Sequence, residues 1–380
     1  MSEQSAIRDP QSTIDVGQIE RELTALWRQA SEEEDHGVIR SCILNLLVYA
    51  SNASEAAEMD DLLADITASH PSRAILIAAE DADEPSLEAQ VTSRCTVPIG
   101  TRKQVCCEQV TITAAGSGLA DVPSAVAPLL LSDLPVYLWW RPVPRTQDKP
   151  LFRKLADISD RVIIDSALFN DPHGDIASMA TVLRETPRWT ALSDLNWARL
   201  TAWRALLSGF YDLPEYRLLL DQLDEVVIEY APQSVDSPVV SARALLLGGW
   251  LVSRLGWRPH SKRATRTADS TRFEFAIDDR AISLDFKRTN RQIEPGHLAL
   301  VTMQSKGDRS VVFTVRRSSD AARIETSVSR DDQKRAQRVL SYEALSEAEL
   351  IGKELEILGH DKVYEQSVLS AGELVGAMGT

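Results

Sequence analysis

Residues 42–79 read CILNLLVYASNASEAAEMDDLLADITASHPSRAILIAA, and this stretch decides the class of the fold. The apolar runs Cys42–Tyr49 and Ala74–Ala79 have the length and composition of buried strands. Between them, Ala56–Ser69 has the pattern of a helix that ends at His70–Pro71, because proline disfavours helical backbone in the residue before it. A strand, a helix and a second strand with short connections form a βαβ unit. We therefore expect parallel strands joined by a right-handed crossover.

The pattern continues on both sides of this unit. An amphipathic helix is predicted over Ile14–Ala30. Downstream strands are predicted over 91–97, 105–114, 135–140 and 161–165, with short helices over 122–131 and 151–155. The first half of the chain should therefore fold as one α/β domain with a mixed sheet.

The second half repeats this plan. A strand over Val226–Tyr230 is followed by a helix over Ser237–Arg254 that Gly256 caps, and then by several short alternating strands. We predict two related mixed-sheet α/β domains joined by a helical segment, with helical N- and C-terminal extensions. The predicted division is an N-terminal helical extension (1–37), an N-terminal α/β domain (38–170), a helical connector (171–223), a C-terminal α/β domain (224–330) and a C-terminal helical tail (331–380).

Composition narrows the class of partner. The chain of 380 residues is 44% hydrophobic, 26% charged and carries a formal net charge of −15. A phosphate backbone would be repelled by this charge, so we expect no nucleic-acid partner. The N-terminus lacks the pattern of a signal peptide, and no run approaches the roughly 20 apolar residues of a membrane span. We expect a cytoplasmic protein with no membrane partner.

The sequence shows no motif for catalysis. It has no GxGxxG after the first strand, no GxxxxGK[ST], no GxSxG and no HExxH. The six histidines are far apart and the four cysteines form no CxxC, so we predict no metal site, no disulfide framework, no cofactor and no catalytic residue. The turn Ala115–Gly118 could hold an anion before a helix, although a flexible turn between strand and helix is the simpler explanation and the one we favour.

Aromatic and arginine side chains are the candidates for a contact surface, because these residue types are enriched in binding hot spots. On a strand, Trp139 and Trp140 point to opposite faces, so at least one is expected to reach the surface. The cluster from Arg188 to Trp203 could instead pack the central helices. The basic segment 254–272 could be a solvated loop. The interface candidates are Trp139, Trp140, Arg141, Arg188, Trp189, Trp197, Trp203, Arg254, Arg258, Lys262 and Arg263.

Several segments together resemble a known family. They are Cys42–Tyr49, His70–Arg73 leading into Ala74–Ile77, Cys106–Ile112, Pro128–Trp140 and Asp160–Ser166. In this order they are similar to the OpcA family, the glucose-6-phosphate dehydrogenase assembly proteins of bacteria. The resemblance is sharp over residues 38–168 and rests on length and layout beyond them.

The resemblance implies a non-catalytic protein that binds glucose-6-phosphate dehydrogenase and promotes its active oligomer and substrate affinity in the oxidative pentose phosphate pathway. Some photosynthetic members are thought to be controlled through cysteines near their C-terminus, and this chain has no cysteine after Cys107. The alternative is an enzyme or metabolite sensor that binds a sugar phosphate through the basic segment 254–272.

Overall fold

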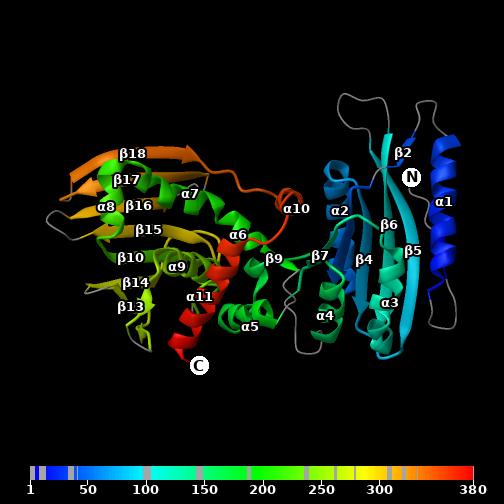
Figure 1. Ribbon diagram of the computed structural model, residues 1–380, viewed down its shortest axis with the longest axis horizontal. Helices are drawn as coiled ribbons and strands as arrows, with labels where there is room; N and C mark the ends of the chain where they lie inside the picture. Colours follow the sequence, from blue (N-terminus) through cyan, green and yellow to red (C-terminus); the bar gives the residue numbers. More distant parts are fainter. Residues whose placement is uncertain are drawn as a thin grey trace. The chain divides into compact units, whose positions relative to one another are not determined.

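The computed structural model describes residues 5–7, 14–32, 38–40, 42–96, 104–142, 149–185, 190–234, 239–260, 263–277, 280–305, 310–318, 322–331 and 333–379 (Figure 1). The chain divides into two compact units. The first comprises Met1–Asp165, Thr186–Leu195 and Ser346–His360, and the second comprises Ser166–Glu185, Asn196–Leu345 and Asp361–Thr380.

The first unit is built on a nine-stranded sheet. Its elements are β1 (Ser5–Ile7), α1 (Val16–Glu32), β2 (Val38–Arg40), β3 (Leu44–Ala50), α2 (Ala53–Ser69), β4 (Ser72–Glu80), β5 (Ser86–Thr96), β6 (Gln104–Ala115), η1 (Gly116–Ala120), α3 (Val122–Val126), η2 (Ala127–Leu129), β7 (Val136–Trp140), α4 (Lys149–Asp157), β8 (Arg161–Ile164), β9 (Ala191–Asp194) and α10 (Glu347–Leu355). The strand order is β1-β5-β6-β4-β3-β7-β8-β9, with β2 paired to β6.

Six neighbouring strands of this sheet, in the order β6-β4-β3-β7-β8-β9, run parallel. Every residue of β3 and β7 is buried, as expected for strands covered on both faces. On one face Phe152 of α4 packs against Trp140, and on the other the Tyr137 hydroxyl donates to Leu355 O of α10. The predicted βαβ unit is confirmed, because β3 and β4 pair in parallel across α2.

We number these six parallel strands in chain order, so that β3 is the first, β4 the second, β6 the third and β7, β8 and β9 the fourth to sixth. Their order across the sheet is then third, second, first, fourth, fifth, sixth, with β5 and β1 added at one edge. This is the order of doubly wound sheets that bind dinucleotides, in which the chain reverses direction between the first and fourth strands. In this molecule that switch point lies between β3 and β7.

The second unit carries another nine-stranded sheet. Its elements are η3 (Ser166–Leu168), α5 (Pro172–Glu185), α6 (Leu195–Arg199), α7 (Thr201–Gly209), η4 (Phe210–Asp212), α8 (Pro214–Leu220), β10 (Leu223–Tyr230), α9 (Ala242–Leu255), β11 (Arg258–Pro259), β12 (Thr265–Arg266), β13 (Ser270–Ile277), β14 (Arg280–Arg288), β15 (Leu298–Ser305), β16 (Val311–Arg317), β17 (Arg323–Arg330), β18 (Gln333–Ser341) and α11 (Lys362–Met378). The strand order is β11-β13-β14-β10-β15-β16-β17-β18, with β12 paired to β13.

Only the pair β10 and β14 is parallel in the described part of this sheet; the other pairs are antiparallel. Buried and partly exposed residues alternate along β10, β15 and β16, which is typical of a sheet with one packed and one solvated face. The packed face includes Phe313, which contacts Phe210, Tyr211 and Tyr216. Gly256 ends α9 in left-handed backbone, as predicted.

The prediction of an α/β protein with two mixed sheets is confirmed. Both units contain a parallel strand pair joined across a helix, although their remaining strand orders differ, and common descent of the two stays a prediction. Two elements differ from expectation: β9 lies in the predicted connector and β18 in the predicted helical tail. Both are short or wholly exposed strands formed by pairing with a neighbour, which local sequence pattern does not encode. The predicted C-terminal tail contributes to both compact units, with α10 in the first and α11 in the second, and the five-part division stays a prediction.

Candidate functional site

The switch point of the first sheet is filled by aromatic side chains. Tyr49 at the end of β3 stacks on Trp140 at the end of β7, with ring centroids 3.8 Å apart and planes 9° apart. Phe152 packs edge-on against Trp140 at 5.2 Å. All three side chains are buried. The aromatic stack therefore lies where the strand order would place a bound dinucleotide.

The first turn of α2 is already occupied by the chain's own carboxylate. Asn52 caps the helix by accepting from Glu55 N at 2.9 Å. The Glu55 carboxylate in turn accepts from Ser51 N at 2.6 Å and from Ser51 Oγ at 2.7 Å. A pyrophosphate normally binds at this helix start over a glycine-rich turn. With a carboxylate at the helix start and no glycine between β3 and α2, these residues do not fit a dinucleotide.

Arg141 pairs with three glutamates near the start of α2 and α10. Its guanidinium pairs with Glu58 at 2.9 Å, Glu347 at 3.5 Å and Glu55 at 3.6 Å. The Arg141 side chain is only 17% exposed. This arginine therefore joins α2 to α10, and its predicted contact role stays a prediction.

The expectation that Trp139 or Trp140 reaches the surface is wrong. Both side chains are 0% exposed. The physical reason is that helices cover both faces of the sheet, so opposite orientation on a strand places each indole under a different helix layer. Trp197 and Trp203 are also buried. Trp197 Nε1 donates to Asp361 Oδ2 at 2.9 Å, and the Arg204 guanidinium lies 3.5 Å above the centre of its ring.

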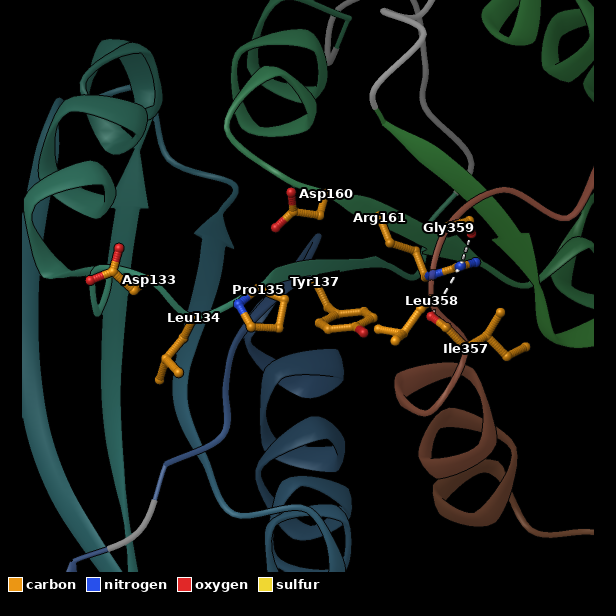
Figure 2. A pocket seen from close by; sticks show the side chains of 9 residues that line it. All are labelled: Asp133, Leu134, Pro135, Tyr137, Asp160, Arg161, Ile357, Leu358 and Gly359. Atoms are coloured by element: carbon orange, nitrogen blue, oxygen red, sulfur yellow. Dashed lines mark hydrogen bonds between the residues drawn. The ribbon is translucent and has the colours of Figure 1, made fainter.

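A cavity of about 450 Å³ lies at the opposite, amino ends of β7 and β8 (Figure 2). Arg161 and the loop after α10 form one of its walls. The Arg161 guanidinium donates to the carbonyl oxygens of Ile357 and Gly359 and to Ser193 Oγ. Arg161 is 2% exposed, whereas Leu358 at the loop tip is 84% exposed. The arginine thus holds a loop that presents an apolar side chain to solvent.

Two further polar side chains near the amino ends of strands, Asn45 of β3 and Arg73 of β4, bond to segments that are distant in the sequence. Asn45 accepts from Leu131 N at 2.8 Å and donates to the carbonyl oxygens of Leu131 and Leu134. Arg73 pairs with Glu20 and with Glu108, each at 2.6 Å. Sequence reasoning did not single out these residues, although a charge at the start of an apolar strand signals a buried partner.

The turn Ala115–Gly118 is a close-packed corner. Gly116 has a φ of +51°, and a Cβ there would lie 2.8 Å from Asp83 O. A Cβ on Gly118 would lie 2.2 Å from Ser86 O. Both positions require glycine because the backbone passes close to Asp83, just before β5, and to Ser86, the first residue of β5. The following helix α3 has only five residues, and we assign no anion site there.

The remaining candidates fall into two groups. Arg254, Arg258 and Arg263 are exposed on the second unit, as a contact role requires. Arg188, Trp189 and Lys262 lie outside the described residues. Their roles in binding a partner stay predictions.

The solvated face of the second sheet is a broad surface of mixed chemistry. We call it the open face; it comprises Glu225, Val227, Glu229, Leu300, Thr302, Gln304, Val312, Thr314, Arg316, Glu325, Ser327 and Ser329. Val227, Thr302 and Thr314 lie side by side on β10, β15 and β16, and Ser327 extends the row onto β17. Charged residues flank this neutral row, as in the Arg316–Glu325 pair at 2.7 Å. A neutral centre with a charged rim is typical of protein interfaces.

Three further findings concern the described residues alone. They contain no group of three or more His, Cys, Asp or Glu side chains arranged to hold a metal ion. Cys107 is buried, and burial raises the pKa of its thiol. Among the helices described here, none combines the length and apolarity needed to cross a membrane.

The fold and these sites define a two-unit α/β protein whose dinucleotide position is closed and whose second sheet has a solvated face. Family comparison gives the narrower assignment. Residues 64–181 match the model described as "Glucose-6-phosphate dehydrogenase subunit N-terminal domain" of OpcA proteins, and residues 190–368 match the corresponding C-terminal domain. The chain belongs to the OpcA family.

Curated relatives agree with this assignment. A "Putative OxPP cycle protein OpcA" from Synechocystis sp. is 27% identical over 80% of this chain and 63% of its own length. Its namesake from Nostoc punctiforme is 32% identical over 64% of this chain and 48% of its own length. The matched part of the chain thus spans about half to two thirds of these relatives.

Solved structures show only distant likeness. Levoglucosan dehydrogenase in complex with NADH is 11% identical, with a TM-score of 0.48, covering 88% of this chain and 96% of that one. An NAD-binding oxidoreductase from Klebsiella pneumoniae is 10% identical, with a TM-score of 0.43 and the same coverage. At these values the likeness carries no information about function.

Proposed function

We propose that this chain is a non-catalytic assembly factor for glucose-6-phosphate dehydrogenase that acts in the cytoplasm. The names of its family models and relatives support the choice of partner. The closed switch point of the first sheet supports a role without dinucleotide chemistry, because Trp140 and Glu55 stand where a cofactor would bind.

The observation that carries the proposal is the open face of the second sheet. Its central row of Val227, Thr302, Thr314 and Ser327 is neutral and only partly exposed. Rim charges such as Arg316 and Glu325 can fix the orientation of a partner, while the centre excludes water. The exposed Arg254, Arg258 and Arg263 of the same unit would assist encounter with an acidic surface.

We further propose that binding activates the dehydrogenase allosterically. An activator needs only a higher affinity for one conformation or oligomer of its partner than for the other. A coupling of roughly 1–3 kcal/mol changes substrate affinity about 5–150-fold. The activator makes no contact with the substrate in this scheme, so no catalytic residue is required of it.

The test is co-purification with the dehydrogenase of the same organism, followed by a substrate saturation curve. We expect a stable complex, a larger oligomer and a lower KM. Thr314→Arg places a charge at the centre of the open face and should weaken the complex roughly tenfold or more. Thr181→Arg makes the same change at an exposed position of α5, and should leave binding unchanged.

The outcomes separate the parts of the proposal. Absence of a complex would overturn the assembly role. A complex without kinetic change would overturn the activator role alone and leave a scaffold. Equal binding by the Thr314→Arg and Thr181→Arg variants would move the contact surface away from the open face.

A further inference from the structure

The last strand of the second sheet, β18, has one unpaired side, which we call the free edge. β18 pairs with β17 and ends the strand order, so among the described residues no strand pairs with its other side. All nine of its residues are exposed. Figure 1 shows β18, in orange, along the margin of its sheet. An exposed edge of this kind offers backbone donors and acceptors to another strand.

A hydrogen bond just after β18 shows which backbone groups point outward. Tyr342 N donates to Ala322 O at 2.8 Å. In an antiparallel pair, hydrogen-bonded residues alternate with residues whose backbone groups point away from the neighbouring strand. Counting back from Tyr342, the even-numbered residues of β18 bond to β17 as far as the irregularity in its register. The N–H and C=O groups of Gln337, Val339 and Ser341 therefore face away from the sheet.

The side chains of β18 restrict which strand can join it. Lys334, Arg335 and Arg338 are basic, and the strand has no acidic residue. None of the three forms an ion pair with another described residue. Glu325 of β17, which lies near Lys334, is already paired with Arg316 at 2.7 Å. Basic side chains on an edge oppose pairing with a strand of like charge, so a partner must bring acidic or apolar residues opposite them.

A second copy of this chain meets that requirement in one register. When two β18 strands pair antiparallel about a two-fold axis at Val339, each Val339 opposes the other and Gln337 opposes Ser341. These are the residues whose backbone groups point outward, so the hydrogen bonds can form. Arg335 of each copy then opposes Glu343 of the other, and both side chains are exposed. An opposite-charge pair thus forms at each end of the contact.

The apolar side chains favour the same register. Val339 is 52% exposed and would be covered by its counterpart, and Leu340, 38% exposed, would lie opposite the aliphatic stem of Arg338. An axis at Gln337 would instead place Arg335 against Val339. An axis at Ser341 would place a carboxylate there. The axis at Val339 therefore joins apolar to apolar and basic to acidic groups.

We propose that the free edge of β18 pairs two copies of this chain in a two-fold antiparallel dimer. The second sheets of the two copies then form one continuous sheet. The contact is the same patch on both subunits, as in most closed dimers. It leaves the open-face residues uncovered and so goes beyond the proposed assembly role. Such a dimer presents two open faces, and an oligomeric partner could engage both.

The test is sedimentation velocity of the full chain, without dehydrogenase, over a range of protein concentrations at constant ionic strength. We expect a reversible equilibrium between monomer and dimer. Val339→Pro removes the outward N–H at the axis in both copies and should raise the dissociation constant roughly tenfold or more. Proline is tolerated on an edge strand when its N–H faces solvent. The control Val339→Thr keeps the N–H and the branched shape, and should change the dissociation constant little.

Charge exchange tests the register itself. Arg335→Glu places two carboxylates opposite each other, and Glu343→Arg places two guanidiniums there. Each single variant should weaken the dimer several-fold, because like charges directly opposite destabilise paired strands. The double variant restores opposite charges and should recover most of the affinity. The matched controls Arg28→Glu and Glu84→Arg make the same changes at exposed positions of the first unit, and should leave the dimer unchanged.

The charge variants keep the test decisive if Val339→Pro fails to fold, which thermal unfolding would show. Weakening by both single exchanges, with recovery in the double variant, supports the proposal. A monomer at every concentration would overturn it, as would a dimer that Val339→Pro leaves equally stable or that the double exchange does not restore. Disruption by Thr314→Arg alone would place the contact between copies on the open face. An effect of Val339→Pro on dehydrogenase binding alone would give the free edge to that partner, and self-pairing would be wrong.

Discussion

The two units bond their buried arginines to different kinds of partner. In the first unit, Arg73 and Arg161, at the amino ends of strands, bond to carboxylates and carbonyl oxygens of the chain itself. In the second unit, Arg243 lies in the first turn of α9 and donates to the Asn196 side chain of α6 at 2.7 Å. In both units a buried guanidinium joins segments that lie far apart in the sequence, and the two units differ in whether the partner that it bonds is charged or neutral.

The largest effect should come from breaking the arginine pairs of the first unit. Arg73→Met removes the guanidinium that pairs with the fully buried Glu108 carboxylate, which should lower the free energy of unfolding by about 3–5 kcal/mol. Urea unfolding measures this. The double variant Arg73→Met with Glu108→Gln should recover part of the loss, because the buried carboxylate charge is gone.

Arg141→Met is the matched control within the same unit. Its partners Glu55, Glu58 and Glu347 are partly exposed, so we expect a loss of about 1 kcal/mol or less. Equal losses for Arg73→Met and Arg141→Met would contradict the view that burial of Glu108 makes the Arg73 cluster structural.

The second unit should be most sensitive where its helices touch. A Cβ on Gly249 of α9 would lie 2.2 Å from Ser367 O of α11. Gly249→Ala should therefore cost about 1–3 kcal/mol, since the backbones must separate. Gly376→Ala in α11 meets nothing within 4 Å and should stabilise by about 0.5–1 kcal/mol. Thermal unfolding of the two variants would show whether close helix approach, rather than helix propensity, sets stability here.

The sequence predicted the fold through local patterns and missed what depends on pairing between distant segments. The βαβ unit over 42–79 followed from apolar runs and a proline stop. The burial of Trp139 and Trp140 could not, because a strand's period gives the face of a side chain but not the helix that covers it. Arg243 carried a readable signal, a lone charge in the apolar run Ala242–Trp250. Its neighbours Asn196 and His297 lie too far along the chain for any spacing rule to connect them.

Acid should destabilise the second unit through His297. Its pKa is about 3 in the folded chain and about 6.5 when unfolded, so the unfolded chain binds the proton first. The stability present above pH 6.5 is lost as pH falls toward 3, by at most about 1.4 kcal/mol per pH unit. His297→Gln, which keeps an acceptor for Arg317, should flatten the loss of unfolding free energy between pH 7 and 5. The exposed His260→Gln is the control, and equal pH slopes for both variants would refute the assignment.

The smallest effects come from two serines that cap helices, one in each unit. Ser346 forms a capping box with Glu349, whose carboxylate accepts from Ser346 N at 2.8 Å and from Ser346 Oγ at 2.9 Å. Ser346→Ala should cost about 1 kcal/mol at neutral pH. The hydrogen bonds from Ser346 lower the pKa of Glu349, so the part of the capping box made by the Glu349 carboxylate is lost as pH falls below the ordinary glutamate value, while the bond from Glu349 N to Ser346 Oγ remains.

Ser241→Ala removes the corresponding cap from α9 and should have a similar cost in urea unfolding at neutral pH. The two variants should differ in their dependence on pH. Residue N3 of α9 is Ala244, which has no carboxylate, so the cost of Ser241→Ala should not change as pH falls. The cost of Ser346→Ala should become smaller, because the Glu349 carboxylate of its capping box is then protonated. Equal pH dependence of the two costs would contradict a contribution from Glu349.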